Sequence, residues 1–586
     1  MNEQPTAYRP ARAQGDEPRA HFRRGKTKPR GVVWFGLSSF WGHLRHFLAS
    51  AIATEDVDSR DWMTPDDPEV LVARIANRLG GDASKSTLGE CLGRDIWIDF
   101  VADTGDDGEV SERVAELIAA DYELPDPDRP DHWIRAPRGE ILLFGGDTAY
   151  PVATGEEINN RVMVPFNRVL ERVDDGKSRA LLGIPGNHDW YDGLDGFARM
   201  FRVRPDQDDE IARPSVVNIE HHTLEKYADW AKKFMKGGHI EKPKTLNLLG
   251  YAPMQGASYF LLPLTPKIHL FAVDRQLKSL DFRQRRFFND WRLQNPGITP
   301  WILLPDPPFK FGEPARNGML MLRALNFRLG AERALIMTGD VHHYARWSEG
   351  QTDFVTAGGG GAFLHPARLY NRSAAPRDRE WPGPRQSARL LMGVPWKVAR
   401  GRSGFIPHIV YALMFTPQLM VALTKDPSVV QQLGAFAAVF VITTTVYALI
   451  GGVRRGRHGL VSLLAACTGA LTACVPLAAA DAAAALMSIS GLALGPWVAA
   501  LIMVLLSCFL SAFIFGAYLA LLTRVGLEHT QAFTALDHPG FKHFLRLRVR
   551  PDEERIDGWC LGLTDPLAKG AKPELVDQFS FLAERR

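Results

Sequence analysis

At 586 residues, the chain is long enough for more than one domain, since domains usually hold roughly 100–200 residues each. Its 69 Lys and Arg residues nearly balance its 66 Asp and Glu residues, so nothing in the charge indicates nucleic-acid binding. The five cysteines are scattered and form no CxxC pair, so neither a structural zinc site nor a disulfide framework is expected.

The N-terminal region is basic and then apolar. Residues 1–30 combine many Arg and Lys residues with Pro and Gly, which is typical of a disordered basic arm. The apolar stretch 32–53 is interrupted by His43, Arg45 and His46, so a cleaved signal peptide is not expected. It is either a buried helix of the next domain or an amphipathic helix on a membrane surface. Residues 1–62 are therefore the first predicted unit.

Residues 63–395 form the second predicted unit, in which apolar, strand-like runs alternate with polar, helix-like stretches. Most of these runs end in a short polar segment rich in oxygen and imidazole side chains, the donors that bind metal ions. An insert at about 200–250 is expected to form helices and loops that cover the site. The five polar segments are Asp103-Thr104-Gly105, Gly146-Asp147-Thr148-Ala149-Tyr150, Gly186-Asn187-His188-Asp189, Leu303-Leu304-Pro305-Asp306 and Gly339-Asp340-Val341-His342.

These segments, in this order, resemble the calcineurin-like metallophosphoesterase superfamily, and more narrowly the purple acid phosphatase motif pattern. The resemblance covers roughly residues 95–365. It implies an α/β (α+β) fold, a two-sheet β-sandwich flanked by helices, with two metal ions at the strand ends. Taken singly, each aspartate is equally well explained as a helix cap or a turn residue.

The resemblance also implies roles for particular residues. The first ion would be held by Asp103, Asp147, Tyr150 and His342, with Asp147 bridging to a second ion. His188 would act on the phosphoryl oxygens or on the leaving group, and Asp189 would orient its ring.

The second ion would take Asn187 and, where the family pattern has histidines, Asp306 and Asp340. Such oxygen ligands favour Mn, Mg or Fe over Zn at this position. The added negative charge favours a diester over a monoester.

Two residues near the last segment are candidates for substrate contact. His343 is either a substrate-binding residue or a solvated neighbour of His342, and Arg346 lies four residues after His342, within reach of a phosphate. Arg275 either lines the cleft or forms a structural salt bridge, and His365 is a further candidate for reaching the substrate.

Residues 400–525 form the third predicted unit, a membrane region of about four helices at 405–424, 433–453, 459–480 and 497–523. The first span contains Pro407, His408 and Pro417, and it either crosses the membrane or lies on its surface as a broken helix. Few polar residues lie in these spans, so they are interpreted as an anchor and not as a transport path.

Positive charges predict the orientation of this region. They place both termini in the cytoplasm, in a multi-pass protein of the cell (inner) membrane. The tail, 526–586, is expected to pack on the catalytic domain, because residues 541–548 alternate like an edge strand. The charges concerned are Lys397, Arg400, Arg402, Arg454, Arg455, Arg457 and Arg524.

The predicted function is a membrane-anchored, metal-dependent phosphoesterase that hydrolyses a phosphate monoester or diester by two-metal activation of water. Anchoring favours a lipid-linked substrate over a soluble phosphorylated small molecule. Two alternatives stay open: a tethered nucleotide or cyclic-nucleotide phosphodiesterase, and a non-catalytic membrane sensor whose phosphoesterase-like domain only binds.

Overall fold

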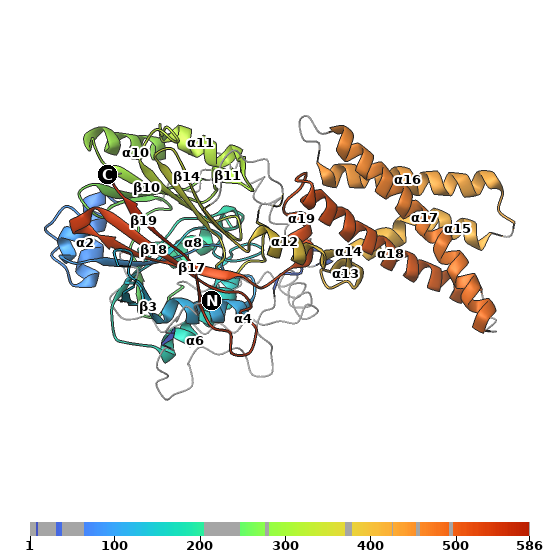
Figure 1. Cartoon of the computed structure of the whole chain (residues 1–586), viewed down its shortest axis with the longest axis horizontal. Coiled ribbons are helices and arrows are strands. Elements are labelled where there is room, and N and C mark those ends of the chain that lie inside the picture. The colour runs from blue at the N-terminus through green and yellow to red at the C-terminus, as the bar shows by residue number, and fades with distance from the viewer. Residues whose placement is uncertain are drawn as a thin grey trace, which may run out of the picture.

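The computed structural model describes residues 8–9, 31–37, 64–129, 131–203, 246–275, 280–367, 369, 378–424, 426–452, 458–490 and 496–584. Most of the basic arm and of the stretch 32–53, residues 204–245 of the predicted insert, and Arg454, Arg455 and Arg457 lie outside the described residues. An α/β part and a helical part meet at α12, α13 and α19 (Figure 1). These junction helices are α12 (Pro384–Leu391), α13 (Val394–Ala399) and α19 (Gln531–Leu536).

Two seven-stranded sheets form the α/β part. The first has the order β19-β18-β17-β2-β5-β6-β7, in which β2, β5, β6 and β7 run parallel. Its strands are β2 (Ile96–Val101), β5 (Ile141–Phe144), β6 (Arg179–Gly183), β7 (Tyr251–Pro253), β17 (Lys542–Arg550), β18 (Arg555–Leu563) and β19 (Glu574–Leu582). The second has the order β16-β14-β15-β13-β10-β9-β8. Its strands are β8 (Phe260–Pro263), β9 (Ile268–Ala272), β10 (Thr299–Leu304), β13 (Ala334–Thr338), β14 (Tyr344–Glu349), β15 (Thr352–Ala357) and β16 (Arg379–Trp381).

The two sheets share an apolar core, in which Leu143 of β5 belongs to the same buried cluster as Trp301 of β10 and Met337 of β13. Leu142 and Phe144 of β5 point to the opposite face, because side chains alternate along a strand. That face packs on helices α4 and α6, while α10 and α11 cover the second sheet. The expected mixed α/β architecture with two large sheets is therefore confirmed. The helices are α4 (Gly108–Ala119), α6 (Val164–Arg172), α10 (Phe282–Gln294) and α11 (Arg316–Ala324).

Shorter elements complete this part. β1 (Tyr8–Arg9), β3 (Asp121–Pro125) and β4 (Trp133–Ala136) form a small sheet, and β11 (Phe309–Lys310) pairs with β12 (Glu313–Pro314). The remaining helices are α2 (Pro68–Leu79), α3 (Leu88–Leu92), α5 (Gly155–Ile158), a π-helix (Asn159–Met163), α7 (Asn187–Trp190) and α8 (Asp195–Phe201).

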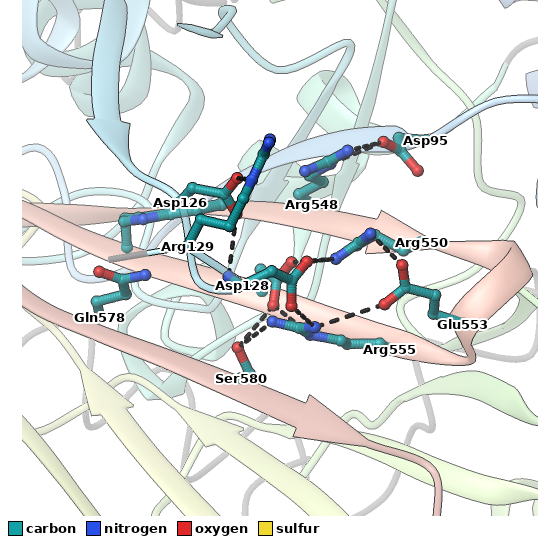
Figure 2. Close-up of polar contacts among 12 residues, drawn as sticks. Asp95, Asp126, Asp128, Arg129, Arg548, Arg550, Glu553, Arg555, Gln578 and Ser580 are labelled. Atoms are coloured by element: carbon teal, nitrogen blue, oxygen red, sulfur yellow. Dashed lines mark hydrogen bonds and ion pairs between the residues drawn. The ribbon is translucent and has the colours of Figure 1, made fainter. Parts of the chain in front are cut away.

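The C-terminal tail is part of the first sheet, and the expectation of an edge strand is wrong for β17. This strand lies between β2 and β18, and β19 is the edge. Its inner position is possible because the polar side chain of Arg546 pairs, fully buried, with Asp99 of β2. At the solvent-exposed end of the strands, Figure 2 shows Arg548 paired with Asp95, and Arg550 with Asp128.

Three described helices are long and apolar enough to cross a membrane: Val429–Gly451, Gly459–Pro476 and Ala500–Arg524. They belong to α16 (Val429–Gly451), α17 (His458–Ser490) and α18 (Pro496–Arg524). The first of the four expected spans is not among them. It forms two short helices, α14 (Ile406–Met414) and α15 (Thr416–Leu423), because Pro417 lacks the backbone N–H that a continuous helix needs.

The broken segment α14–α15 nevertheless packs within the helical bundle. The Tyr411 hydroxyl lies 2.7 Å from the Tyr447 hydroxyl of α16, and the Gln418 amide donates to the Ala473 carbonyl of α17 at 3.0 Å. Tyr411 and Phe415 also share a buried cluster with Cys508 of α18.

Candidate active site

Three aspartates follow strand ends in an unusual backbone conformation. Asp103 after β2, Asp147 after β5 and Asp340 after β13 have φ angles of 59°, 49° and 63°. Positive φ is uncommon outside glycine and persists where the surroundings enforce it, often at functional sites. The backbone N–H of Asp340 donates to Asp103 Oδ2 at 2.8 Å, so the two sheets meet at these residues.

Four predicted ligands converge on one point. The Tyr150 hydroxyl lies 3.0 Å from Asp103 Oδ1, 3.4 Å from Asp147 Oδ2 and 3.1 Å from His342 Nε2. His342 Nε2 is in turn 3.4 Å from Asp103 Oδ1. Ligands that lie about 2.1 Å from one ion are themselves roughly 3 Å apart, so this spacing matches a metal shell.

Contacts on the side away from the acidic cluster set the orientation of the His342 ring. Its Nδ1 donates to the Phe363 carbonyl at 2.6 Å, which leaves Nε2 turned toward the acidic cluster. The His365 ring stacks on the His342 ring with centroids 4.0 Å apart, and His365 Nδ1 accepts the backbone N–H of His342 at 3.0 Å. His365 is therefore a support for His342.

The charge of this cluster also fits a cation. Asp103 and Asp147 are 0% and 3% exposed. In the part of the chain that the structure describes, neither carboxylate forms an ion pair with Lys or Arg. Burial raises the pKa of both carboxyls well above the ordinary value, and their mutual repulsion raises it further for Asp147. Such carboxylates are costly to bury unless a positive ion neutralises them.

A tyrosine, in addition to the usual His, Cys, Asp and Glu ligands, completes the cluster. Within the described part of the chain, no group of three or more His, Cys, Asp and Glu side chains is arranged to hold a metal ion by itself. The Tyr150 phenol, which contacts Asp103, Asp147 and His342, is what joins these side chains into one donor set.

The predicted second position is different, because cations occupy its carboxylates. Lys310 Nζ lies 3.0 Å from Asp306 Oδ1 and also contacts Asp340 Oδ2, while Arg275 Nη1 contacts Asp306 Oδ2. Burial raises the pKa of Asp306, but Lys310 and Arg275 outweigh it and hold that pKa below the ordinary value. Arg275 therefore forms a structural salt bridge, which was one of the two interpretations that the sequence left open for it.

Asn187, the remaining predicted ligand of this position, is oriented by its neighbour: its amide nitrogen donates to the Tyr191 hydroxyl at 3.2 Å. Lys310 is the site residue that sequence reasoning missed. The available signal was its position four residues after Asp306, across two prolines.

His188 lies beside the four-ligand cluster. Its Nδ1 donates to the Pro151 carbonyl at 2.6 Å, and its ring centroid is 4.4 Å from that of Tyr150. The partner of His188 Nδ1 is thus the Pro151 carbonyl, and the predicted role of Asp189 in orienting the ring stays a prediction. Asp189 accepts the backbone N–H groups of Gly186 at 2.8 Å and of Thr148 at 3.3 Å, so it ties two ligand loops together.

The two predicted substrate contacts lie in different surroundings. His343 is buried, with its ring centroid 5.9 Å from that of Phe311. Arg346 of β14 pairs with Asp577 of the tail at 2.6 Å and with Asp378 at 3.1 Å. Its guanidinium therefore joins the second sheet to the tail, and these contacts do not bring it to the ligand cluster.

Glycines allow the backbone to approach the carboxylates closely. A Cβ on Gly186 would lie 2.1 Å from Asp147 Oδ1, and one on Gly358 would lie 2.6 Å from Asp103 Oδ2. The tail supports the glycine-rich loop that contains Gly358, since the backbone N–H of His543 donates to the Gly359 carbonyl at 2.9 Å. The site thus depends on the C-terminal strands.

A segment of the N-terminal region connects the site to the membrane helices. The Trp34 ring lies 6.1 Å from the His188 ring and 5.2 Å from the Phe363 ring, measured between centroids. The next residue, Phe35, donates its N–H to the Ser403 carbonyl at 3.0 Å and accepts the N–H of Ile406 at the start of α14. The candidate site therefore lies at the end of the α/β part that adjoins the helical part.

Comparison with known proteins adds little to this geometry. No protein-family model and no curated protein matches the chain. Among solved structures, the chain is similar to GAP50, described as the anchor in the inner membrane complex of Plasmodium, at 10% identity and a TM-score of 0.27. That alignment covers 49% of this chain and 78% of GAP50. A likeness at this level carries no argument about fold or function.

Proposed function

We propose that the chain is a membrane-anchored, metal-dependent phosphoesterase with the metallophosphoesterase fold. The observation that carries this proposal is the convergence of Asp103, Asp147, Tyr150 and His342, buried and spaced as ligands, with His188 beside them. A bound ion would supply Lewis-acid charge to a phosphate ester.

The protein residues divide the remaining work. The Pro151 carbonyl holds the proton of His188 Nδ1, so Nε2 is the atom that exchanges a proton with the leaving oxygen. The backbone N–H of His188 donates to Asp147 Oδ1 at 2.8 Å, which turns Asp147 Oδ2 toward the other ligands.

A lipid-linked phosphate is the substrate class that we favour. The support is the position of Trp34, whose ring lies beside His188 while the following residue is hydrogen-bonded to the start of the membrane region. An ester group at the membrane interface has a short path to such a site. A tethered nucleotide phosphodiesterase would need no such placement.

We further propose that α14–α15 is a fourth crossing. β17 follows the last apolar helix in the chain and pairs with β2, which precedes the first, so the chain must cross the membrane an even number of times. Three crossings would separate these strands. A broken helix is tolerated in a bilayer where neighbouring helices pack on the break, as α16, α17 and α18 do at the buried Phe415.

The sidedness follows from basic residues at the end of the bundle near the α/β part. Lys397, Arg400 and Arg402 precede α14, and Arg524 ends α18. By the positive-inside rule, the active site and the tail face the cytoplasm of a cell (inner) membrane.

The test is hydrolysis by the full-length protein in detergent, loaded in turn with Mn, Mg, Fe or Zn. The substrates are a chromogenic monoester, a chromogenic diester and a phospholipid in mixed micelles. We expect turnover of at least one ester that is lost in Asp147→Asn. The matched control is Asp290→Asn, at a surface pair of α10 with Arg286, which should hydrolyse the ester like the wild type. Absence of both bound metal and turnover under every loading would contradict the proposal and favour a binding module.

A further inference from the structure

Lys310 is held in a defined position between two carboxylates of the candidate site. It lies in β11, where the preceding Phe309 packs its ring edge-on against Phe354 with centroids 5.7 Å apart. Because neighbouring side chains of a strand point to opposite sides, this anchoring directs Lys310 away from the core. Its Nζ contacts both Asp306 and Asp340.

The charges at this position already balance. Asp306 is 1% exposed, and its two oxygens have separate cationic partners, Lys310 at Oδ1 and Arg275 at Oδ2. Two carboxylates, of Asp306 and Asp340, thus face two cations. A second metal ion would have to displace the cations or lie beside them, and the nearest further carboxylates among the described residues, those of Asp103 and Asp147, belong to the first position.

We infer that the Lys310 ammonium takes the place of a second metal ion, so that the centre is built to hold one ion. This inference deepens the proposed function and rests on it. An ammonium has three N–H donors. Asp306 and Asp340 engage two of them and fix the group in place, and the third is available to a phosphoryl oxygen. Phosphate would then be bound between one metal ion and one lysine, with Arg275 holding Asp306 in position.

The decisive measurement is the number of Mn ions per chain in purified full-length protein, determined by elemental analysis after loading and removal of unbound metal. The variants are Lys310→Met, which keeps the length of the side chain without its charge, and the double variant Lys310→Met/Arg275→Met. Lys310→Arg keeps the charge. Lys267→Met is the matched control, since Lys267 pairs with Glu584 and lies 44% exposed. Asp147→Asn verifies that the counted ion lies at this site.

We expect about one ion per chain in the wild type, in Lys310→Arg and in Lys267→Met, and about two in the double variant, as in two-metal hydrolases. The electron paramagnetic resonance spectrum of Mn should change from that of an isolated ion to that of a coupled pair. Two ions in the wild type, or no ion in it, would overturn the inference, and so would a single ion in the double variant. One ion without hydrolysis of any ester would instead contradict the proposed function. The failure of the one-ion inference and the failure of the proposed function therefore give different results.

Discussion

The Arg546 guanidinium donates to both oxygens of the Asp99 carboxylate, at 2.8 and 3.0 Å, although 447 positions separate the two residues in the chain. Both side chains are fully buried, and Arg546 also donates to the carbonyls of Ile118, Ala120 and Ala136. The pair joins β2, which precedes the membrane helices, to β17, which follows them. The sheet that carries the candidate site can therefore be completed only after the membrane region has been synthesised.

Removing the charge of Arg546 should destabilise the α/β part strongly. Arg546→Met leaves Asp99 buried without its partner, and breaking a buried ion pair in this way typically costs about 3–5 kcal/mol of the free energy of unfolding. Denaturant titration in detergent, followed by tryptophan fluorescence, measures the loss. Arg286→Met is the control, because Arg286 and Asp290 form an exposed pair expected to contribute less than about 1 kcal/mol. Equal effects of the two substitutions would contradict this account.

His188 should act on the reaction without holding metal. We expect His188→Gln to lower kcat by about 10²- to 10⁴-fold, the usual contribution of a general acid or base, with the metal content unchanged. The reason is that its ring lies beside the four ligands and its Nδ1 is engaged by Pro151. Parallel kinetics and elemental analysis provide the check. Loss of the metal together with activity would make His188 a structural part of the ligand shell.

Trp34 should matter more for a lipid substrate than for a soluble one. The indole lies beside His188, and the next residue, Phe35, is hydrogen-bonded to the start of α14, so under the proposed function it would contact the part of a lipid next to the phosphate. We expect Trp34→Ala to lower kcat/KM for a phospholipid by roughly 5- to 10-fold, the size of one lost aromatic contact. A chromogenic ester should be little affected, and Trp133→Ala, at an exposed tryptophan of β4, should affect neither. The same loss on both substrates would argue against the lipid interpretation.

Acid should destabilise the α/β part through its buried neutral histidines. Burial lowers the pKa of His269 from 6.5 to about 4, and its Nδ1 accepts the Trp291 indole N–H at 3.0 Å. Because the unfolded chain then binds more protons than the folded chain between these values, this contribution is complete above pH 6.5 and is lost as the pH falls toward 4. His543, whose pKa burial lowers to about 3, adds to the same trend.

Thermal unfolding between pH 7 and pH 4 measures this effect. We expect the difference in Tm between the wild type and His269→Gln, which cannot be protonated, to decrease as the pH falls from 7 to 4. A difference that is independent of pH over this range would show that His269 is not buried in its neutral form.

The proposed fourth crossing can be tested by labelling. A cysteine at Ser428, in the turn between α15 and α16, should react with a membrane-impermeant maleimide added outside intact cells, whereas one at Ser580 of β19 should not. The unsubstituted chain is the control for its native cysteines. Labelling of Ser580→Cys and not of Ser428→Cys would reverse the orientation. Because β19 belongs to the same sheet as β2, which precedes α14, labelling of both cysteines or of neither would put Ser428 on the same side as the α/β part and would contradict a crossing by α14–α15.

Local pattern was enough to predict the strands and their polar ends. The runs before Asp103, Asp147 and Asp340 are apolar and end in a turn, and both properties depend only on neighbouring residues. The structure brings three of the predicted side chains, those of Asp103, Asp147 and His342, onto the Tyr150 hydroxyl. The apolar length of α16 and α18 likewise identified membrane helices without knowledge of the fold.

What the sequence by itself determined, then, is which segments are strands, which helices are apolar and which polar side chains end the strands. The tertiary structure decided the rest: β17 became an inner strand through Arg546 and Asp99, and Lys310 came to lie between Asp306 and Asp340. The physical reason is that hydrogen-bonding periodicity and hydrophobicity act over a few residues. The partner of a buried charge, in contrast, is set by how distant strands pack, and no local spacing specifies it.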